Sequence, residues 1–151
     1  MSFLLDTNLL SATAPARRIE GDAPKQAARA WITAQADRIF LPTTAIAEIA
    51  AGIGAREAAG ATRHAMELAE WLRAVLVAHP ERILPLDTAA ALHLRALNAA
   101  ARRIGHAPSF ADLSIAAIAR QHGLTVATRN IKDFAPMGVA TLDPFRIEED
   151  A

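Results

Sequence analysis

The sequence predicts an α/β protein in which helices cover the faces of a central parallel sheet. Short apolar runs of strand length alternate along the chain with longer segments whose apolar residues recur at helical spacing. No Asn-Gly pair joins two of these runs as a tight hairpin. Because parallel strands need long crossover connections, usually helices, this alternation favours a parallel sheet.

Five apolar runs are predicted as strands. The first ends at Asp6, Thr7 and Asn8, which we interpret as a polar turn. Pro42 closes the second strand, and Pro85 indicates that the third lies at a sheet edge or ends there. The predicted strands cover residues 2–5, 38–42, 83–86, 124–128 and 139–142.

The segments between these strands are predicted as helices. Thr43 or Thr44 caps the second helix, Gly60 loosens the start of the third, and Gly105 and Gly123 end the last two. The first predicted helix opens at a proline that follows an irregular segment, residues 11–22. The first predicted helix begins at residue 24, and the others cover residues 43–53, 56–78, 87–104 and 109–121.

Length and composition indicate one packed domain. The chain has 151 residues, of which 52% are hydrophobic and 21% charged, and we expect a single domain over residues 1–145 with an acidic tail over 146–151. The formal net charge is zero, so the composition by itself gives no argument for a nucleic-acid partner. An RNA-binding face would have to gather arginines locally, among Arg17, Arg18, Arg102, Arg103 and Arg129.

The chain has no cysteine, which excludes disulfides, thiolate metal sites and a cysteine nucleophile. The N-terminal segment has no basic stretch before its short apolar run and meets Asp6 early, so it resembles neither a signal peptide nor a membrane span. We therefore expect a cytoplasmic protein with no membrane partner. The five histidines show no His-Glu-x-x-His spacing and no zinc-finger pattern.

Polar residues at strand ends are the candidates for chemistry, because ligands of open parallel sheets bind beyond the carboxyl ends of the strands. Asp6 follows the first predicted strand, and Thr128 ends the fourth, with Asn130 and Asp133 close behind it. Two more acids lie on helices next to these strands: Glu48 after the second strand and Asp112 before the fourth.

Asp112 shares a helical face with Ile115, Ala116 and Ala119, and this apolar face should point toward the sheet. A carboxylate on an inward face needs an ion partner, hydrogen bonds or a bound cation, because burying a bare charge costs several kcal/mol. The neighbours of Glu48 at helical spacing are small, which leaves room for a ligand. Such acids suit Mg²⁺, which takes one or two carboxylates and completes its shell with waters and phosphate oxygens.

Each candidate also has a structural explanation. Asp6 can terminate its strand through hydrogen bonds to the backbone, and a lone Glu48 on a helix is usually solvent-exposed. The pairs Ser109 with Asp112 and Asn130 with Asp133 fit capping boxes in which Asp replaces Glu. The placement of all these acids on one expected rim of the sheet favours the functional interpretation.

Four segments carry a resemblance to a known family, and together they span nearly the whole chain. The sequence resembles the PIN-domain family of VapC-type toxins, and its C-terminal third resembles the branch called FitB-like. The likeness is carried by Leu4-Leu-Asp-Thr-Asn8 with Ser11, by Ala47-Glu-Ile-Ala-Ala-Gly52, by Ala111-Asp-Leu-Ser-Ile-Ala-Ala117 and by Val126-Ala-Thr-Arg-Asn-Ile-Lys-Asp-Phe134.

The resemblance implies a PIN-like three-layer α/β/α sandwich that hydrolyses RNA phosphodiesters with Mg²⁺ or Mn²⁺. Asp6, Glu48 and Asp112 match the three acidic positions of the family, which hold the metal, and Thr128 matches its hydroxyl position. Asn130 replaces a fourth acid that many members carry, unless Asp133 takes that role.

The resemblance also implies partners: a second copy in a homodimer, and a small VapB-type antitoxin that binds operator DNA and blocks the acidic pocket, often with an inserted arginine. Two alternatives differ in function. One is a catalytically inactive PIN-like module that only binds a partner, which the amide at Asn130 keeps open. The other is a signalling receiver, although the chain has a single acid after its first strand and only two lysines.

Overall fold

The computed structural model describes residues 1–15 and 21–146. Its sheet has five parallel strands in the order β3-β2-β1-β4-β5. This architecture confirms the predicted α/β class with a central parallel sheet. The strands are β1 (Phe3–Leu5), β2 (Ile39–Pro42), β3 (Ile83–Leu84), β4 (Thr125–Ala127) and β5 (Thr141–Leu142).

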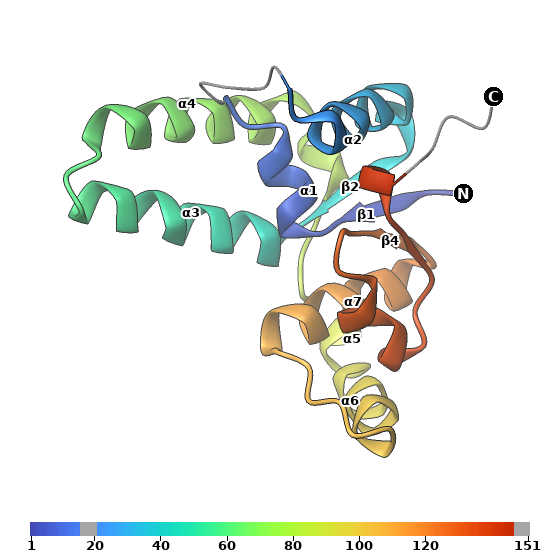
Figure 1. Cartoon of the computed structure of the whole chain (residues 1–151). Helices are drawn as coiled ribbons and strands as arrows, with labels where there is room; N and C mark the ends of the chain where they lie inside the picture. The colour runs from blue at the N-terminus through green and yellow to red at the C-terminus, as the bar shows by residue number, and fades with distance from the viewer. Residues whose placement is uncertain (16–20, 147–151) are drawn as a thin grey trace.

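Helices lie on both sides of this sheet (Figure 1). On one side are α1 (Thr7–Ala12), α2 (Ala23–Ala34), α3 (Thr43–Ala58) and α4 (Thr62–Ala78). On the other side are α5 (Thr88–Ala91), α6 (Leu94–Arg103) and α7 (Phe110–His122). The shorter elements are α8 (Ile131–Phe134) and four 3₁₀ turns, η1 (Ala36–Arg38), η2 (Pro80–Arg82), η3 (Ala135–Met137) and η4 (Pro144–Arg146).

Side chains of the central strands alternate between the two helical layers. Leu4 and Val126 are fully buried in a cluster with Ile115 and Ile118 of α7. Their neighbours in sequence, among them Phe3, point to the opposite cluster, which α2 covers. This period-two pattern on a sheet with two buried faces explains why the strands read as continuous apolar runs.

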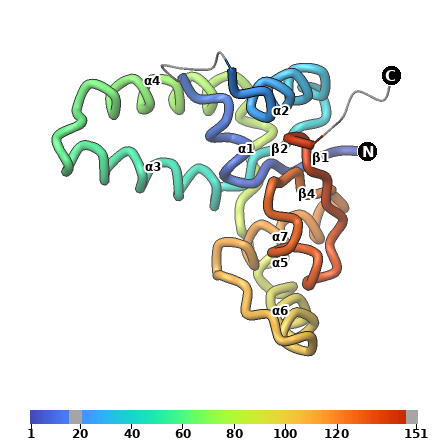
Figure 2. The backbone as a smooth tube through the Cα atoms, in the orientation of Figure 1, coloured from blue at the N-terminus to red at the C-terminus, as the bar shows by residue number. Residues whose placement is uncertain are grey.

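A helical hairpin of α3 and α4 projects from the body of the molecule (Figure 2). Ile49 and Ile53 of α3 pack in one cluster with Leu68 and Leu72 of α4. The hairpin turns at Gly60, which has φ +86°, a backbone conformation that glycine adopts without strain. The prediction of one helix over 56–78 was therefore wrong at its start, because the break lies at 59–61 rather than before Arg56.

Three other local predictions were wrong. Residues 7–12 form the helix α1 rather than a turn, because Asp6 accepts a hydrogen bond from the Thr7 backbone as its N-cap. The predicted helix over 87–104 is divided into α5 and α6 at Leu92 and His93. Neither Thr43 nor Thr44 caps α3, because its N-cap is Pro42 and no side chain forms a cap hydrogen bond there. In addition, the short helix α8 was not predicted.

The remaining helices and the strands lie where the sequence predicts them, with shifts of a few residues at their ends. Residues 147–151 of the predicted acidic tail, as well as Arg17 and Arg18, lie outside the described residues. A single domain over 1–145 stays a prediction. In the ranges 1–15 and 21–146, no helix has the length and hydropathy needed to cross a bilayer.

Candidate active site

Asp6 lies at the carboxyl end of β1 and is only 6% exposed. Its Oδ1 accepts a hydrogen bond from the Thr7 backbone N–H at 2.7 Å, and its Oδ2 accepts one from Thr128 Oγ1 at 2.8 Å. Asp6 and Thr128 meet because β1 and β4 are parallel neighbours, with Leu5 opposite Ala127. Hydrogen bonds thus hold both carboxylate oxygens of Asp6 in place at the edge of the sheet that is formed by the carboxyl ends of its strands.

Glu48 reaches the same edge from the second turn of α3. The Thr7 hydroxyl donates a hydrogen bond to Glu48 Oε1 at 2.6 Å. Thr7 therefore joins two acids: its backbone N–H binds Asp6 and its side chain binds Glu48. Glu48 also borders a groove of about 850 Å³ that continues between α3 and α4. This groove agrees with the open space that the small neighbours of Glu48 predict.

Asp112 lies in the first turn of α7. Ser109 caps this helix, because its Oγ accepts a hydrogen bond from the Asp112 backbone N–H at 3.1 Å. The cap engages the backbone of Asp112 and leaves its half-buried carboxylate available. The next turns of α7 lie against the sheet with Ile115, Ala116 and Ala119 buried, as the sequence predicts.

The acids lie in one another's electric field. Burial is the largest cause that raises the pKa of Asp6, and the charges of Asp112 and Glu48 raise this pKa further. Hydrogen bonds from Thr128 and Thr7 oppose this rise by stabilising the charged form of Asp6. The three predicted metal ligands are therefore near enough to one another for their charges to interact.

Burial also raises the pKa of Asp112, and the charges of Asp133 and Glu48 add to this effect. The Ser109 hydrogen bond and the His106 imidazole oppose it. Asp133 is therefore close enough to act electrostatically on Asp112. Asn130 and Asp133 are the two candidates for the family's fourth acidic position, and only Asp133 has a carboxylate.

Asn130 contacts the site through its backbone. Its N–H donates to Thr128 Oγ1 at 2.9 Å, so Thr128 accepts from Asn130 while it donates to Asp6. The Asn130 side chain forms no cap hydrogen bond with α8, and the Asp133 backbone N–H donates to the Asn130 backbone carbonyl instead. The capping-box explanation of this pair is therefore wrong, whereas Ser109 does cap the Asp112 backbone.

The donor chemistry of this edge fits Mg²⁺. The acids Asp6, Glu48, Asp112 and Asp133 present only oxygen ligands, and none of them forms an ion pair with a described basic residue. Within the described ranges, no three acidic, histidine or cysteine side chains form a ready-made cation site. Mg²⁺ needs only one or two protein carboxylates, because it keeps waters and binds phosphate oxygens, so the oxygen ligands of these acids fit it without a group of three.

Two residues of the site were missed by sequence reasoning. Thr7 was interpreted as part of a turn, although it belongs to the segment that carries the family resemblance, and this was the available signal. His106 was grouped with the other histidines. It lies beside Asp112, and its buried Nε2 has no hydrogen-bond partner among the described residues. Nothing in the sequence spacing distinguished this histidine from the other four.

The comparison with known families decides the identity of the fold. Residues 3–138 match the family model described as PIN domain. The chain belongs to the PIN-domain family. The predicted PIN-like architecture and the likeness to VapC-type and FitB-like toxins are confirmed. The signalling-receiver alternative is therefore dropped.

Two relatives match this PIN domain over nearly their full length. Plasmid stability protein StbB of Pseudomonas syringae pv. tomato is 34% identical over 143 residues, with 94% of this chain and 97% of the relative covered. VapC ribonuclease Y4jK of Sinorhizobium fredii is 33% identical over 143 residues, with 94% and 96% covered.

A solved structure of FitAB bound to an IR36 DNA fragment contains a chain with the same fold. It superposes on this PIN domain with a TM-score of 0.79 at 26% identity, and 99% of each chain is covered. A third relative, Toxin FitB of Neisseria gonorrhoeae, is 31% identical over 143 residues, with 94% of this chain and 97% of the relative covered. Among these relatives, FitB is thus named as a toxin and Y4jK as a ribonuclease.

Proposed function

We propose that this PIN domain is an Mg²⁺-dependent endoribonuclease and the toxin of a VapBC-type toxin–antitoxin module. The observation that carries the proposal is the placement of Asp6, Glu48 and Asp112 at one sheet edge without ion pairs to described basic residues. Clustered carboxylates that lack cationic partners are destabilising unless they serve to hold a cation.

In this proposal Asp6, Glu48 and Asp112 hold Mg²⁺, or alternatively Mn²⁺. The bound ion supplies Lewis-acid chemistry that makes a water more acidic and offsets negative charge at the phosphate. Thr128 and Thr7 orient the Asp6 carboxylate toward the site. Asp133 supplies the fourth acid in place of Asn130, an assignment that its effect on the pKa of Asp112 supports.

The mechanism needs no protein nucleophile. Water, oriented by the negative carboxylates, attacks the phosphorus of an RNA phosphodiester and gives up a proton to a carboxylate or to solvent. The P–O bond to the leaving ribose oxygen breaks, and that oxygen takes up a proton. The raised pKa values of Asp6 and Asp112 indicate that these groups hold a proton more strongly than ordinary carboxyl groups. The negatively charged RNA product is then repelled by Asp6, Glu48 and Asp112, which we call the acidic edge.

The proposed partners are a VapB-type antitoxin and a second copy of this chain, with operator DNA bound only through the antitoxin. The groove beside Glu48 supports the antitoxin proposal, because its walls include apolar Ile53, Leu68 and Trp71 and it extends as far as Glu48. A peptide segment in this groove can extend an arginine toward the carboxylates, which an arginine fork pairs with well.

The test is RNA cleavage by the purified protein with Mg²⁺, followed on labelled single-stranded RNA. We expect cleavage that a chelator abolishes and that falls at least about 100-fold in Asp6→Asn and Asp112→Asn. Glu70→Gln is the matched control, because Glu70 is an exposed acid on α4, away from the acidic edge. Cleavage that persists at full rate in both site variants would place the active site elsewhere.

An inactive PIN-like module remains the second candidate, because Asn130 carries an amide where many members have an acid. The two candidates give different results in the same assay. An inactive module binds the product of a neighbouring antitoxin gene but cleaves no RNA and causes no growth arrest. The toxin arrests growth on expression, and co-expression of the antitoxin relieves the arrest.

A further inference from the structure

A second cavity lies next to the acidic edge and was not anticipated by the sequence. Its volume is about 560 Å³, and it is lined by Arg129, Asn130, Ile131, Lys132, Asp143 and Arg146. Arg129 follows Thr128 directly at the end of β4, and Asp143 follows the end of β5. This basic cavity therefore opens at the carboxyl ends of β4 and β5, beside Asp6, which follows β1.

The basic cavity carries an excess of positive charge. Its single acid, Asp143, is already engaged: Oδ1 accepts from the Phe145 backbone N–H at 2.9 Å, and Oδ2 lies 3.5 Å from Arg146 Nε. Arg129 and Lys132 form no ion pair with any acid in residues 1–15 or 21–146. Two exposed cations thus face this cavity without an anionic partner.

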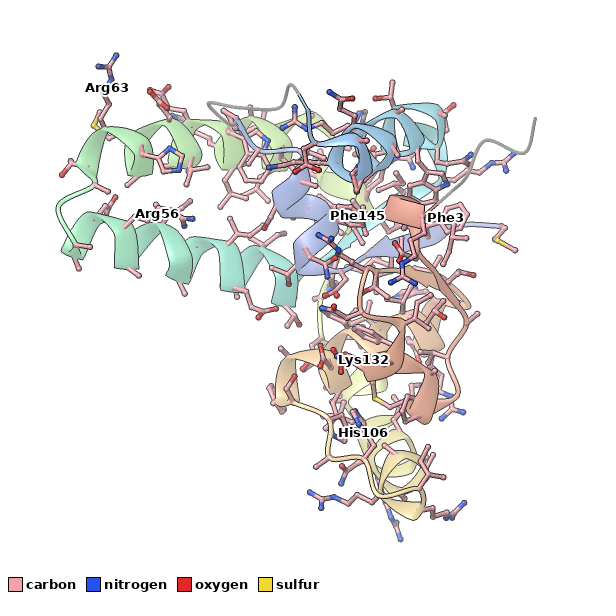
Figure 3. All side chains as sticks on the ribbon, in the orientation of Figure 1. Phe3, Arg56, Arg63, His106, Lys132 and Phe145 are labelled. Atoms are coloured by element: carbon pink, nitrogen blue, oxygen red, sulfur yellow. The ribbon has the colours of Figure 1, made fainter. Side chains whose placement is uncertain are left out.

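Arg129 is held in place without being neutralised. Its guanidinium carbon lies 5.1 Å from the centroid of the Phe145 ring, a cation–π contact. A cation–π contact leaves the guanidinium charged, so its N–H groups can still donate to an anion. Figure 3 labels Phe145 and, on the same C-terminal part of the chain, Lys132. The arrangement favours an anion with several acceptor oxygens.

The same loop is connected to the acidic edge. Thr128 donates to Asp6, and the Asn130 backbone N–H donates to Thr128, so the residues on both sides of Arg129 belong to the hydrogen-bonded site. An RNA strand that reaches Asp6 must pass a group of like-charged carboxylates. Cations beside that group offset the repulsion between the carboxylates and the backbone phosphates.

We propose that the basic cavity binds a backbone phosphate of the RNA next to the phosphodiester that is cleaved. Arg129 and Lys132 donate to this phosphate, and Arg146 forms the outer wall. This inference rests on the proposed function, since it names how the substrate of the acidic edge is held. The contact is to phosphate and therefore sets the position of the strand rather than its sequence.

The decisive experiment measures RNA binding separately from cleavage. A labelled short single-stranded RNA is titrated with protein in a chelator, and the dissociation constant is determined at several salt concentrations. The double variant Arg129→Ala/Lys132→Ala is compared with Arg120→Ala, an exposed arginine at the end of α7 and so at the opposite edge of the sheet. Equal melting temperatures of the two variants check that both are folded, and Arg129→Gln/Lys132→Gln replaces the alanine pair if they differ.

We expect the double variant to bind RNA about tenfold more weakly at low salt. The slope of log affinity against log salt should fall by about 0.7, the value for one lost phosphate contact to a single strand. Arg120→Ala should bind like the unmodified chain. With Mg²⁺, the double variant should raise KM and leave kcat nearly unchanged, since it removes binding shared by substrate and transition state.

The outcomes separate this proposal from the nuclease function. If the chain cleaves RNA but the double variant binds RNA as well as Arg120→Ala does, the basic cavity is not a phosphate site and the nuclease function stands. If the chain cleaves nothing but the double variant loses RNA affinity, the cavity stands and the nuclease function fails. A loss confined to single-stranded DNA of the same sequence, or to an acidic protein partner, overturns the assignment to RNA.

Discussion

The hydroxyl of Thr128 donates a 2.8 Å hydrogen bond to Asp6 Oδ2, although the two residues are 122 positions apart in the chain. Both side chains are buried. The bond lowers the pKa of Asp6 against the larger effect of burial, so it helps to keep the carboxylate charged. We therefore expect the activity proposed for the acidic edge to depend on Thr128, a residue that binds no metal in our proposal.

The first prediction concerns this bond. Thr128→Val keeps the shape of the side chain but removes the donor, so the pKa of Asp6 should rise further. The acidic limb of the pH profile for RNA cleavage should then move to higher pH. The control is Thr125→Val on the same strand, which should leave the profile unchanged. A profile of Thr128→Val that overlays the unmodified one contradicts the role assigned to this hydroxyl.

The second prediction concerns stability and pH. The pKa of Asp6 is raised in the folded state, so folding favours the protonated form, and stability is lost as the pH rises from the unfolded value of 3.8 through the folded pKa. Asp6→Asn removes this loss and should therefore melt at a higher temperature than the unmodified chain at pH 7. The difference in melting temperature between Asp6→Asn and the unmodified chain should become smaller as the pH falls from 7 toward 4. Thermal unfolding at several pH values in this range measures it.

The third prediction concerns metal binding. Mg²⁺ that binds only the folded state stabilises it, by about 2.7 kcal/mol at a concentration 100 times the dissociation constant. Mg²⁺ should therefore raise the melting temperature of the unmodified chain and of Glu70→Gln, and a chelator should reverse the rise. Asp112→Asn should respond much less. An equal rise in all three proteins would show that the ion does not bind at the acidic edge.

The fourth prediction concerns Thr7. Its hydroxyl holds Glu48, and substitutions of residues that orient metal ligands typically cost 10- to 100-fold in affinity or activity. Thr7→Val should reduce RNA cleavage by about this factor, whereas Thr7→Ser, which retains the hydroxyl, should keep most of the activity. Equal losses in the two variants would indicate that the methyl group of Thr7 matters rather than its hydrogen bond.

The fifth prediction concerns the groove beside Glu48, where we propose that the antitoxin binds. Gly52 lines this groove one turn after Glu48, and a Cβ at Gly52 meets only Arg56 Nη1, at 3.6 Å. Gly52→Leu should fill the groove and weaken antitoxin binding at least about tenfold without unfolding α3, because leucine favours helix over glycine. Gly54→Leu is the matched control, since Gly54 lies on the same helix but not in the groove. The measurement is the dissociation constant for purified antitoxin. Equal constants for Gly52→Leu and Gly54→Leu would contradict antitoxin binding in this groove.

Local patterns in the sequence predicted most of the fold. The strands around Leu4 and Val126 are apolar because both faces of the sheet are buried, and a continuous apolar run is a direct record of that environment. The helix α1 was missed because Asp6, Thr7 and Asn8 are as common in turns as at helix starts. The break between α5 and α6 falls within an alanine-rich segment, where helical propensity predicts no interruption.

The sequence by itself identified the residues that we predict to carry the chemistry, Asp6, Glu48 and Asp112, by residue type and by position after strands or on adjacent helices. Only the tertiary structure decided how they are held, through Thr7, Thr128 and the field of Asp133. It also decided that Arg129 and Lys132 share a cavity with Arg146. The physical reason is distance: strand and helix patterns are short-range and periodic, whereas these contacts join side chains from separate elements, and no periodicity encodes them.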